Sequence, residues 1–584
     1  MSAATGALSR PQRWCLIALL AIGALVRLWT LDADPHQRLQ RGYIYDEGEY
    51  QKNARQLVLF GQWQLDDYNP QTQLGPVHAV ALAGIYRAFG VGLWQARLPQ
   101  ALGGILTCVL IFVLVRRALG PTIALWALAF HAIGFFGVVY ERSGFTDSIQ
   151  LPFIVTMIFF GVAALGSPIY GVLAGAAAAG AMLAKPTAAI VLVIVALIWA
   201  AAWMVQRRDP SSPWKASGII MFGLAFGVIV LIDVIVVVIP NWSEFVGLFQ
   251  IASGGVFDSG SRATQYVRTT FLPVDAIGMA STGFVETMIG PLAIILLFAI
   301  RRLLGTVPQA ISVAERTCWI WLVAGLGYMS IQRYQPDRRF LFLLPAVAVL
   351  SAVAIALWRE TQPPRLTRWR TALTGSLIGG FAGFYLGLAL GGPLQELADS
   401  LGRPLSLGFV RSAVFTVAVL AGLGLGAPVA GILSRWAPRI PIAIVAVAIL
   451  AIDFSREALF LARPTYTHLA ATRSIAAFAE GLPDDARHIF GGEANTMAIA
   501  SRLIGHGQHQ TGSGDPGRTY RPALYTVSWQ GRHGLVPPDS APGVSPKMPF
   551  CRSFALSPVA DWHRFLVGVY IREDLVARCA EWTH

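Results

Sequence analysis

Five acidic side chains in two polar stretches of the sequence could do chemistry. They are Asp46, Glu47 and Glu49 in "GYIYDEGEYQKNARQLVLFGQW", residues 42–63, and Glu141 and Asp147 in "YERSGFTDSIQ", residues 140–150. Each stretch follows an apolar run that is long enough to cross a membrane, or nearly so. A carboxylate held in a fixed place can take the proton of an acceptor hydroxyl group. The question is whether these acids act on a substrate or only begin a helix.

The first acidic stretch also has the pattern of an ordinary amphipathic helix. Apolar residues between Tyr50 and Val58 recur at helical spacing and form one face, whereas most of the polar residues of "QKNAR" fall elsewhere, as expected at a membrane surface. This pattern predicts a helix that lies flat on the membrane. Asp46 and Glu49 are three residues apart and fit a variant of the capping box, which satisfies free N–H groups of the first turn. A purely structural role for the acids therefore stays open here.

Three arginines, Arg333, Arg338 and Arg339, occur in "QRYQPDRRFLFLLPAVAVL", residues 332–350. The topology described below places them on the outer side of the membrane, against the usual excess of Lys and Arg on the inner side. Guanidinium groups suit phosphate oxygens, so one explanation is that these arginines bind an anion. The alternative is that they anchor the chain to lipid headgroups.

The composition indicates a polytopic membrane protein. Of 584 residues, 55% are hydrophobic and 13% are charged, and the mean hydropathy is +0.57. The net charge of +13 does not indicate binding to nucleic acid, because the basic residues form short clusters between apolar runs, as the positive-inside rule describes. No CxxC, HExxH or glycine-rich phosphate-loop motif occurs, so zinc-hydrolase and soluble-nucleotide chemistry have no support.

Thirteen apolar runs are long enough to span a bilayer, or nearly so, since a span takes about 20 residues. They are 13–30, 98–115, 121–139, 149–166, 169–184, 186–204, 216–239, 284–300, 316–331, 339–357, 371–391, 407–433 and 440–461. The run at 76–90 is shorter, and the basic clusters all fall on one side only if it does not cross. These spans predict an all-α membrane domain at 1–461 with a cytoplasmic N-terminus. No signal peptide is expected, because the first run lacks a convincing cleavage site.

Three segments are expected on the outer face. They are a first loop with juxtamembrane helices at 31–97, a second loop at 240–283 and a C-terminal domain at 465–584. Strand-like alternation from Phe550 predicts a small α+β fold for the C-terminal domain. Of the five cysteines, Cys551 and Cys579 lie in this domain, and an oxidising compartment would allow them to form a disulfide. Two buried free thiols are the alternative.

Six motifs follow one another in a particular order. They are "DEGEYQKNARQLVLFGQW", "GPVHAVALAGIYRAFG", "ARLPQALGGILTCVLIFVLVRRALG", "ERSGFTDS", "GAMLAKPTA" and "RRFLFLLPAVAVL". With this order and topology, residues 13–357 resemble the membrane-embedded glycosyltransferases of the GT-C class. The branch is the one that contains the protein O-mannosyltransferases and the aminoarabinose transferase of lipid A. The thirteen spans and the non-crossing helix agree with that family's architecture. No resemblance is recognised beyond residue 357.

The resemblance implies transfer of a sugar from a polyprenyl-phosphate donor to a hydroxyl acceptor, with inversion, on the outer face of a bacterial inner membrane. Asp46 matches the family's first acidic position, the expected general base, and Glu47 is the weaker alternative. Asp147 matches the second acidic position, which is expected to orient the acceptor or the catalytic carboxylate. Arg338 and Arg339 match the family's arginine position and are the expected ligands of the donor phosphate.

The sequence departs from the family in one place. Related transferases often carry Lys or His just before the proline of the juxtamembrane helix, whereas this chain has Leu74 and Gly75. His78 is a candidate substitute, as a phosphate or metal ligand, and an interfacial histidine with no special role is the alternative. Lys185 in "AKPT" is another candidate phosphate ligand, unless it only extends toward the membrane surface. No cofactor is required by these residues, and dependence on a divalent metal stays open.

Two other functions remain alternatives. Asp233 and Asp453 lie inside predicted helices, as acids do in secondary transporters, but the chain shows no matched pair of interrupted segments. An oligosaccharide ligase with a polyprenyl-diphosphate donor would share the fold class, but would not be expected to begin with an acidic first loop. The sequence identifies neither the sugar nor the acceptor, which could be a surface glycan, lipid A, a cell-wall polymer or a protein. Membrane lipids are the other expected partners.

Overall fold

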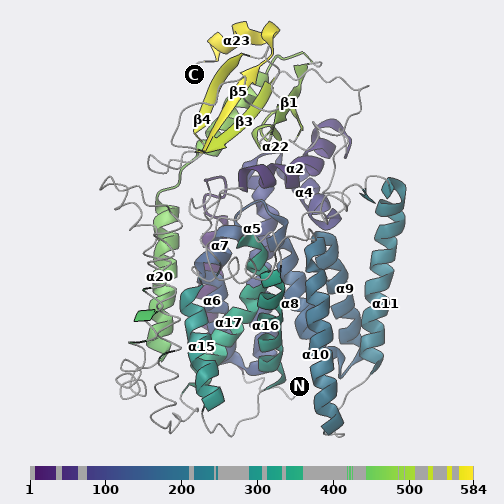
Figure 1. Cartoon of the computed structure of the whole chain (residues 1–584), viewed down its shortest axis with the longest axis vertical. Coiled ribbons are helices and arrows are strands. Elements are labelled where there is room, and N and C mark those ends of the chain that lie inside the picture. Colours follow the sequence, from purple (N-terminus) through teal and green to yellow (C-terminus); the bar gives the residue numbers. More distant parts are fainter. Residues whose placement is uncertain are drawn as a thin grey trace.

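The computed structural model shows an upright bundle of helices with a β-sheet at one end (Figure 1). The structure describes residues 7–34, 43–63, 75–208, 216–242, 288–304, 312–331, 337–358, 442–483, 486–491, 494–506, 524–530, 549–555 and 565–582, with a few single positions between them. Most of the loop expected at 240–283 lies outside the described residues, and so does Arg333.

The bundle consists of helices with mostly apolar sequences. In chain order they are α1 (Arg10–Leu28), α5 (Leu93–Leu119), α6 (Pro121–Ile133), α7 (Phe135–Glu141), α8 (Thr146–Ala164), α9 (Pro168–Ala184), α10 (Ala189–Arg208), α11 (Ala216–Asp233), α15 (Ile289–Leu304), α16 (Val313–Ile331), α17 (Leu344–Leu357) and α20 (Ile442–Ala462). In the described part of the chain, six helical stretches are long and apolar enough to cross a membrane, or seven if the bent pair α6 and α7 is one span. The chain is an integral membrane protein.

The apolar runs of the sequence coincide with helices wherever the structure describes them. The expected span at 121–139 is divided into α6 and α7, which are bent by 57° at Gly134. The bend requires a glycine here, because a Cβ atom on Gly134 would lie 2.5 Å from the carbonyl oxygen of Phe130. The runs at 371–391 and 407–433 lie almost entirely outside the described residues, so the count of thirteen spans stays a prediction.

Small residues allow α8, α9 and α11 to pack closely. A Cβ atom on Gly171 of α9 would lie 2.0 Å from the carbonyl oxygen of Gly218 on α11. A Cβ atom on Gly218 would lie 1.9 Å from the carbonyl oxygen of Ala164 on α8. Larger side chains would push these helices apart. Membrane helices associate through such close contacts, since lipid supplies no hydrophobic force between them.

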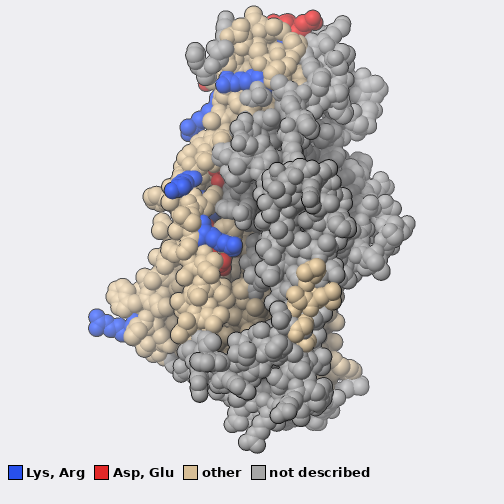
Figure 2. Space-filling model, turned by 60° about the vertical axis from the view of Figure 1, so that its left-hand side comes forward, with Lys and Arg blue, Asp and Glu red and all other residues tan. Residues whose placement is uncertain are grey.

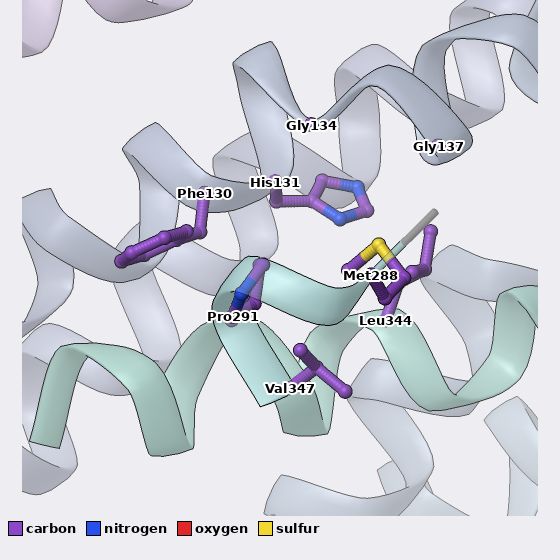
Figure 3. A pocket seen from close by; sticks show the side chains of 9 residues that line it. Phe130, His131, Gly134, Gly137, Met288, Pro291, Leu344 and Val347 are labelled. Atoms are coloured by element: carbon purple, nitrogen blue, oxygen red, sulfur yellow. The ribbon is translucent and has the colours of Figure 1, made fainter. Parts of the chain in front are cut away.

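The helix α17 lies at the centre of the bundle and is buried along almost its whole length, against α6, α15 and α16. A small pocket lies where α6, α15 and α17 meet beside the bend at Gly134 (Figure 3). His131 is the polar side chain in its lining, which also includes Phe130, Gly134, Gly137, Met288, Pro291, Leu344, Val347 and Ala348. The 3₁₀ helix η5 (Asp337–Leu343) precedes α17 and carries Arg338 and Arg339 to the sheet end of the bundle.

The described surface of the bundle carries few charges. Figure 2 shows one face of the molecule, on which Lys and Arg side chains lie at separate points and form no continuous patch. Large apolar side chains on α11, such as Ile220, Leu224 and Val228, are exposed. Exposed apolar side chains of this kind are expected on helices that face lipid.

Two further helices, α2 (Tyr43–Phe60) and α4 (Pro76–Phe89), lie at the end of the bundle, between the membrane helices and the sheet (Figure 1). The short run at 76–90 forms α4, which has 14 residues. A helix of that length is too short to span a bilayer, which takes about 20 residues. Its position at the end of the bundle fits the expected juxtamembrane role.

Two expectations for α2 are wrong. The helix begins at Tyr43, three residues before Asp46, so Asp46 and Glu49 do not form a capping box at its start. Its polar side does not lie free at a membrane surface either: Gln51 and Lys52 are buried, as are most of their polar neighbours. The reason is that α4 and the short C-terminal helix α22 (Ala494–Met497) cover α2. The sequence predicts the helical period of α2, but it does not show that α4 and α22 cover the polar side.

The C-terminal residues form a five-stranded sheet with the order β2-β1-β3-β5-β4. The strands are β1 (His488–Gly491), β2 (Ile504–His506), β3 (Leu524–Gln530), β4 (Phe550–Ala555) and β5 (Phe565–Ile571). Strand β1 pairs with β2 and β3 in parallel, and β5 pairs with β3 and β4 in antiparallel fashion. Two further helices, α21 (Thr467–Ala479) and α23 (Val576–Glu581), accompany the sheet. The domain limits of 465–584 stay a prediction.

A disulfide and a buried tryptophan fix α23 to the other C-terminal elements. Cys551 on β4 and Cys579 on α23 form the disulfide, with Cα atoms 5.8 Å apart. The ring of Trp582 lies 4.4 Å from that of Phe478 on α21, centroid to centroid, and its indole N–H donates to Ser474. The last helix is therefore held to both the edge strand and α21.

Candidate active site

Four charged side chains from separate parts of the chain meet at the sheet end of the bundle. They are Asp46 on α2, Asp147 on α8, Lys185 just after α9 and Arg338 on η5, called the four-residue cluster below. Nη2 of Arg338 donates to Oδ2 of Asp46, and its Nε lies 3.6 Å from Oδ2 of Asp147. Nζ of Lys185 donates to the same oxygen of Asp147 at 2.6 Å. Arg338 thus joins the two carboxylates, and the charges of the cluster balance.

The members of the cluster differ in their access to solvent. The side chains of Asp147 and Arg338 are 1% and 10% exposed, whereas that of Asp46 is 24% exposed. Asp46 is therefore the carboxylate that a molecule outside the protein reaches more easily. Oδ1 of Asp147 is buried and has no hydrogen-bond partner among the described residues. A buried acceptor without a partner costs free energy, so this oxygen suits a donor group on a ligand.

Two aromatic rings, Tyr50 and Phe145, lie against the cations of the cluster. Cζ of Arg338 lies 4.6 Å from the centroid of the Phe145 ring, and Nζ of Lys185 lies 5.6 Å from that of Tyr50. The two rings meet edge to face, with centroids 6.3 Å apart. A ring face attracts a cation, and more strongly where water is excluded. The rings therefore help to hold both cations beside the carboxylates.

The segment that connects α7 to α8, and so leads to Asp147, is held in place by contacts with α1 and α7. Glu141, at the end of α7, is buried and pairs with Arg27 of α1 at 2.5 Å. Arg142 donates to two main-chain carbonyl groups near the end of α1, and the Ser143 hydroxyl donates to a carbonyl group of α7. Asp147 then lies in the first turn of α8, where the helix dipole favours a negative charge. The position of this carboxylate is therefore set by the packing of α1, α7 and α8.

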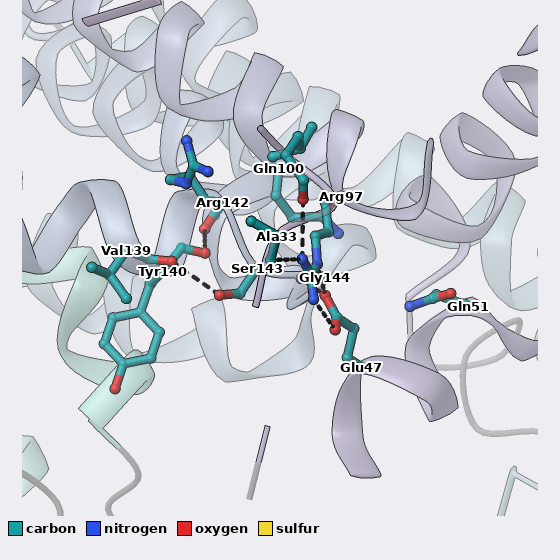
Figure 4. Close-up of polar contacts among 12 residues, drawn as sticks. Ala33, Glu47, Gln51, Arg97, Gln100, Val139, Tyr140, Arg142, Ser143 and Gly144 are labelled. Atoms are coloured by element: carbon teal, nitrogen blue, oxygen red, sulfur yellow. Dashed lines mark hydrogen bonds and ion pairs between the residues drawn. The ribbon is translucent and has the colours of Figure 1, made fainter. Parts of the chain in front are cut away.

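Glu47 follows Asp46 in sequence but belongs to a structural ion pair (Figure 4). Its oxygens accept from Nε and Nη2 of Arg97 on α5, at 2.6 and 2.9 Å, and Oε1 also accepts from the N–H of Gly144 at 2.7 Å. Burial alone would raise the pKa of Glu47, but the Arg97 charge and these hydrogen bonds outweigh burial and lower the pKa. Glu47 thus ties α2 to α5 and to the segment before α8. This arrangement favours Asp46 over Glu47 as a base.

Arg339, which is half-buried, lines a neighbouring pocket between α8, α10, α16 and η5. The pocket adjoins the cluster along the chain, since Gln150 lies one helical turn after Asp147 and Thr187 lies two residues after Lys185. Its lining consists of Gln150, Ile154, Thr187, Ala188, Ile190, Val191, Tyr328, Met329, Arg339 and Phe342. Of the two adjacent arginines, the structure brings Arg338 to the carboxylates.

His78, on α4, is fully buried beside the cluster. Its Nε2 lies 2.7 Å from the side-chain amide of Gln100, and its ring meets Tyr50 edge to face. Burial, and next the charge of Lys185, lower the pKa of His78 to about 4, so the ring is neutral near pH 7 and offers phosphate no positive charge. Within the described ranges, no three His, Cys, Asp or Glu side chains form a group that could hold a metal ion.

Two buried arginines that hold the site together, Arg27 and Arg97, were not predicted from the sequence. Both are at most 1% exposed. A signal for them existed, because each lies at the edge of an apolar run, where a charged residue needs a partner. The contacts of Tyr50 and Phe145 with the cations were not predicted either. No sequence pattern predicts those contacts, because each joins two elements that are distant along the chain.

A family model described as dolichyl-phosphate-mannose-protein mannosyltransferase matches residues 73–236. The matched range contains α4 to α11 and includes His78, Asp147 and Lys185, but it ends before Arg338 and begins after Asp46. No curated protein sequence matches the chain significantly.

Solved structures match the chain over almost its whole length. ArnT from Cupriavidus metallidurans in the apo state is 20% identical, has a TM-score of 0.58, and the match covers 96% of this chain and 98% of ArnT. ArnT bound to undecaprenyl phosphate is 15% identical over the same shares, with a TM-score of 0.55. The chain has the ArnT fold. The GT-C fold predicted from the sequence motifs is confirmed, and the ArnT fold also extends past residue 357, where the motifs end.

Proposed function

We propose that the chain is a glycosyltransferase that moves a sugar from a polyprenyl-phosphate donor to a hydroxyl group of an acceptor. The four-residue cluster carries the proposal, because it joins two carboxylates to two cations at one end of the bundle. The ArnT fold supports the reaction class, and a structure of ArnT holds undecaprenyl phosphate. The family model that matches residues 73–236 is also named for a phosphate-linked sugar donor.

In the proposed reaction, Arg338 and Lys185 bind the donor phosphate. Both cations now pair with carboxylates, whose oxygens resemble those of phosphate in charge and spacing. A phosphate can therefore replace Asp46 as a partner of Arg338, and it can bind Lys185 beside Asp147. The same cations stabilise the negative charge that grows on phosphate as it leaves the sugar carbon. Arg339 lines the adjoining pocket and is the second arginine available to the donor.

Asp46 is the proposed general base. When the donor phosphate engages Arg338, Asp46 loses part of its ion pair and becomes a better acceptor for the proton of the incoming hydroxyl group. That oxygen then attacks the sugar carbon from the side opposite the phosphate, which inverts its configuration. Asp147 stays with Lys185 and orients the sugar or the acceptor through Oδ1, which has no partner within the described residues.

The reaction is proposed to take place on the outer face of a bacterial inner membrane, with the N-terminus in the cytoplasm. The distribution of basic clusters between the apolar runs supports this orientation. In the proposed reaction two side-chain cations stabilise the leaving phosphate, and transfer measured after chelation of divalent metals tests whether a metal also takes part.

Membranes of a deletion strain provide the test, because they contain both the accumulated donor and the unmodified acceptor. Purified wild-type protein should consume the polyprenyl-phosphate sugar, as followed by mass spectrometry of extracted lipids. Asp46→Asn should abolish consumption while leaving the protein folded, because it removes the base without changing its size. Asp574→Asn, at an exposed carboxylate paired with Arg572, is the matched control. Normal turnover by Asp46→Asn would refute the base. Membranes without a polyprenyl-phosphate sugar would refute the donor class.

A further inference from the structure

The C-terminal part of the chain contacts α2 directly after Asp46. The side-chain N–H of Asn495, on α22, donates to Oε1 of Glu49 at 2.6 Å, and both side chains are buried. The helices also approach closely at Gly48, where a Cβ atom would lie 2.3 Å from the main-chain nitrogen of Thr496. The turn of α2 that carries the proposed base is therefore covered by α22.

A second contact lies further along α2. Arg55 is buried, and its Nη2 donates to the carbonyl oxygens of Ser501 and Leu503 at 2.6 and 2.7 Å. These carbonyl groups belong to the segment between α22 and β2. Hydrogen bonds from a charged donor are stronger than those between neutral groups. The C-terminal chain is thus joined to α2 at both ends of a stretch about two helical turns long.

A third contact fixes the beginning of the C-terminal part. Asp34, which follows α1, accepts hydrogen bonds from the main-chain N–H groups of Thr467 and His468 at 2.7 and 2.9 Å. It therefore caps the first turn of α21 from a distant part of the chain, in the manner of an N-cap residue. With these three contacts, the C-terminal part is joined both to α2 itself and to the segment between α1 and α2.

The opposite side of the same turn of α2 is held by the membrane helices. Successive residues of a helix point about 100° apart, so Asp46, Glu47 and Glu49 face different directions. Asp46 meets Arg338, Glu47 meets Arg97 of α5, and Glu49 meets Asn495 of α22. The turn is therefore held by α5 through Glu47 and by α22 through Glu49, and Asp46 points from it toward the cluster.

We propose that the C-terminal part is a clamp on α2 that sets the position of Asp46, with Glu49 and Asn495 as positioning residues. This inference rests on the proposed function, because it assigns the clamp to the role of Asp46 as base. Loosening the clamp displaces the base, and a displacement of about 1 Å can lower a rate by about 10²-fold. Donor binding is retained, because Arg338 and Lys185 belong to η5 and the segment after α9.

An exchange of the two partners tests the clamp. Asn495→Asp places a carboxylate against Glu49, and kcat should fall about 10- to 100-fold while KM for the donor lipid stays within about twofold. Glu49→Gln should have a smaller effect, since two amides can still form a hydrogen bond. The double variant Glu49→Gln/Asn495→Asp restores the contact with donor and acceptor exchanged, and should recover most of kcat. Wild-type kcat in Asn495→Asp, or no recovery in the double variant, would overturn the clamp.

A control and a second measurement separate the clamp from folding and from the proposed function. Thr526→Val removes the hydrogen bond to Phe490 inside the sheet, and should lower thermal stability without lowering kcat. If Thr526→Val lost as much kcat as Asn495→Asp, the loss would come from lower stability in general, and the clamp would be refuted. Hydrogen–deuterium exchange should be faster in α2 of Asn495→Asp than in wild type. If wild type transfers no sugar, the proposed function fails, and unchanged exchange in α2 would separately refute the clamp.

Discussion

Replacing Arg338 with Ala should damage transfer more than any other change of a cation in the cluster. Arg338 donates to Asp46, lies 3.6 Å from Asp147 and packs on the ring of Phe145. Its removal leaves two carboxylates with Lys185, so the cluster changes from balanced charge to a net charge of about −1 at the place where an anionic phosphate must bind. Both donor binding and stabilisation of the leaving phosphate should suffer.

The distance from Arg338 to Asp147 gives the scale of the effect. Two unit charges 3.6 Å apart interact by about 4–5 kcal/mol at an effective dielectric constant of about 20. A phosphate that takes the place of a carboxylate would have an interaction of the same order. Removal of one such electrostatic contact typically costs roughly 2.7–4 kcal/mol, or about 10²–10³ in rate. We therefore expect Arg338→Ala to lower kcat/KM for the donor by about 10²–10³.

The assay is transfer from purified donor lipid in detergent, measured at several donor concentrations. Arg338→Lys should recover part of the loss, because a single ammonium group keeps the charge but cannot reach two partners as a guanidinium fork does. Arg339→Ala is the matched control, since Arg339 lines the adjoining pocket, and its loss of rate should be smaller. A wild-type rate for Arg338→Ala at low donor concentration would refute the reasoning, and the phosphate site would then have to be sought at Lys185.

Three further changes test other parts of the structure. Glu47→Gln should lower the free energy of unfolding by roughly 3–5 kcal/mol, measured by denaturation in detergent, because its arginine partner stays buried without a counter-charge; an unchanged stability would contradict the structural role of that pair. The pKa of His78 is lowered to about 4 by burial and by a nearby lysine, below its unfolded value of 6.5, so the unfolded chain binds the proton first. The free energy of unfolding should therefore fall by up to about 3 kcal/mol as pH decreases from about 6.5 to about 4. The melting temperature should fall between pH 7 and pH 5, and it should fall less in His78→Gln than in wild type. Replacing both Cys551 and Cys579 by Ser should destabilise the C-terminal sheet by about 2–4 kcal/mol, and equal melting temperatures with and without reductant in wild type would argue against the disulfide.

Much of the candidate site could be predicted because its residues lie in recognisable motifs. Asp46, Asp147, Lys185 and Arg338 each occur in one of the six motifs, and the structure places them together although Asp46 and Arg338 are 292 residues apart. Topology helped, since charge distribution puts the ends of these elements on one side of the membrane. Their roles as base and phosphate ligands stay predictions until the variants are measured.

The sequence could not separate neighbours with the same chemistry. Glu47 stands next to Asp46 and has the same functional group, yet one helical step turns it toward Arg97 and away from the cluster. Likewise, Arg339 lines the pocket between α8, α10, α16 and η5, whereas Arg338 meets the carboxylates. A step of about 100° between successive helical residues decides such cases, but only once the packing of the helix is known.

The sequence by itself determined that the protein is a helical membrane protein and which of its stretches carry chemistry. Apolar runs long enough to cross lipid must form helices, because backbone groups have no other partners there, and that constraint is local. Only the tertiary structure decided which side chains meet. The sequence of α2 predicts that its polar side faces a membrane surface, yet Gln51 is buried and accepts a hydrogen bond from Tyr86 of α4, and Arg55 is buried under a C-terminal segment. The physical reason is that burial depends on contacts between segments hundreds of residues apart, which no local periodicity records.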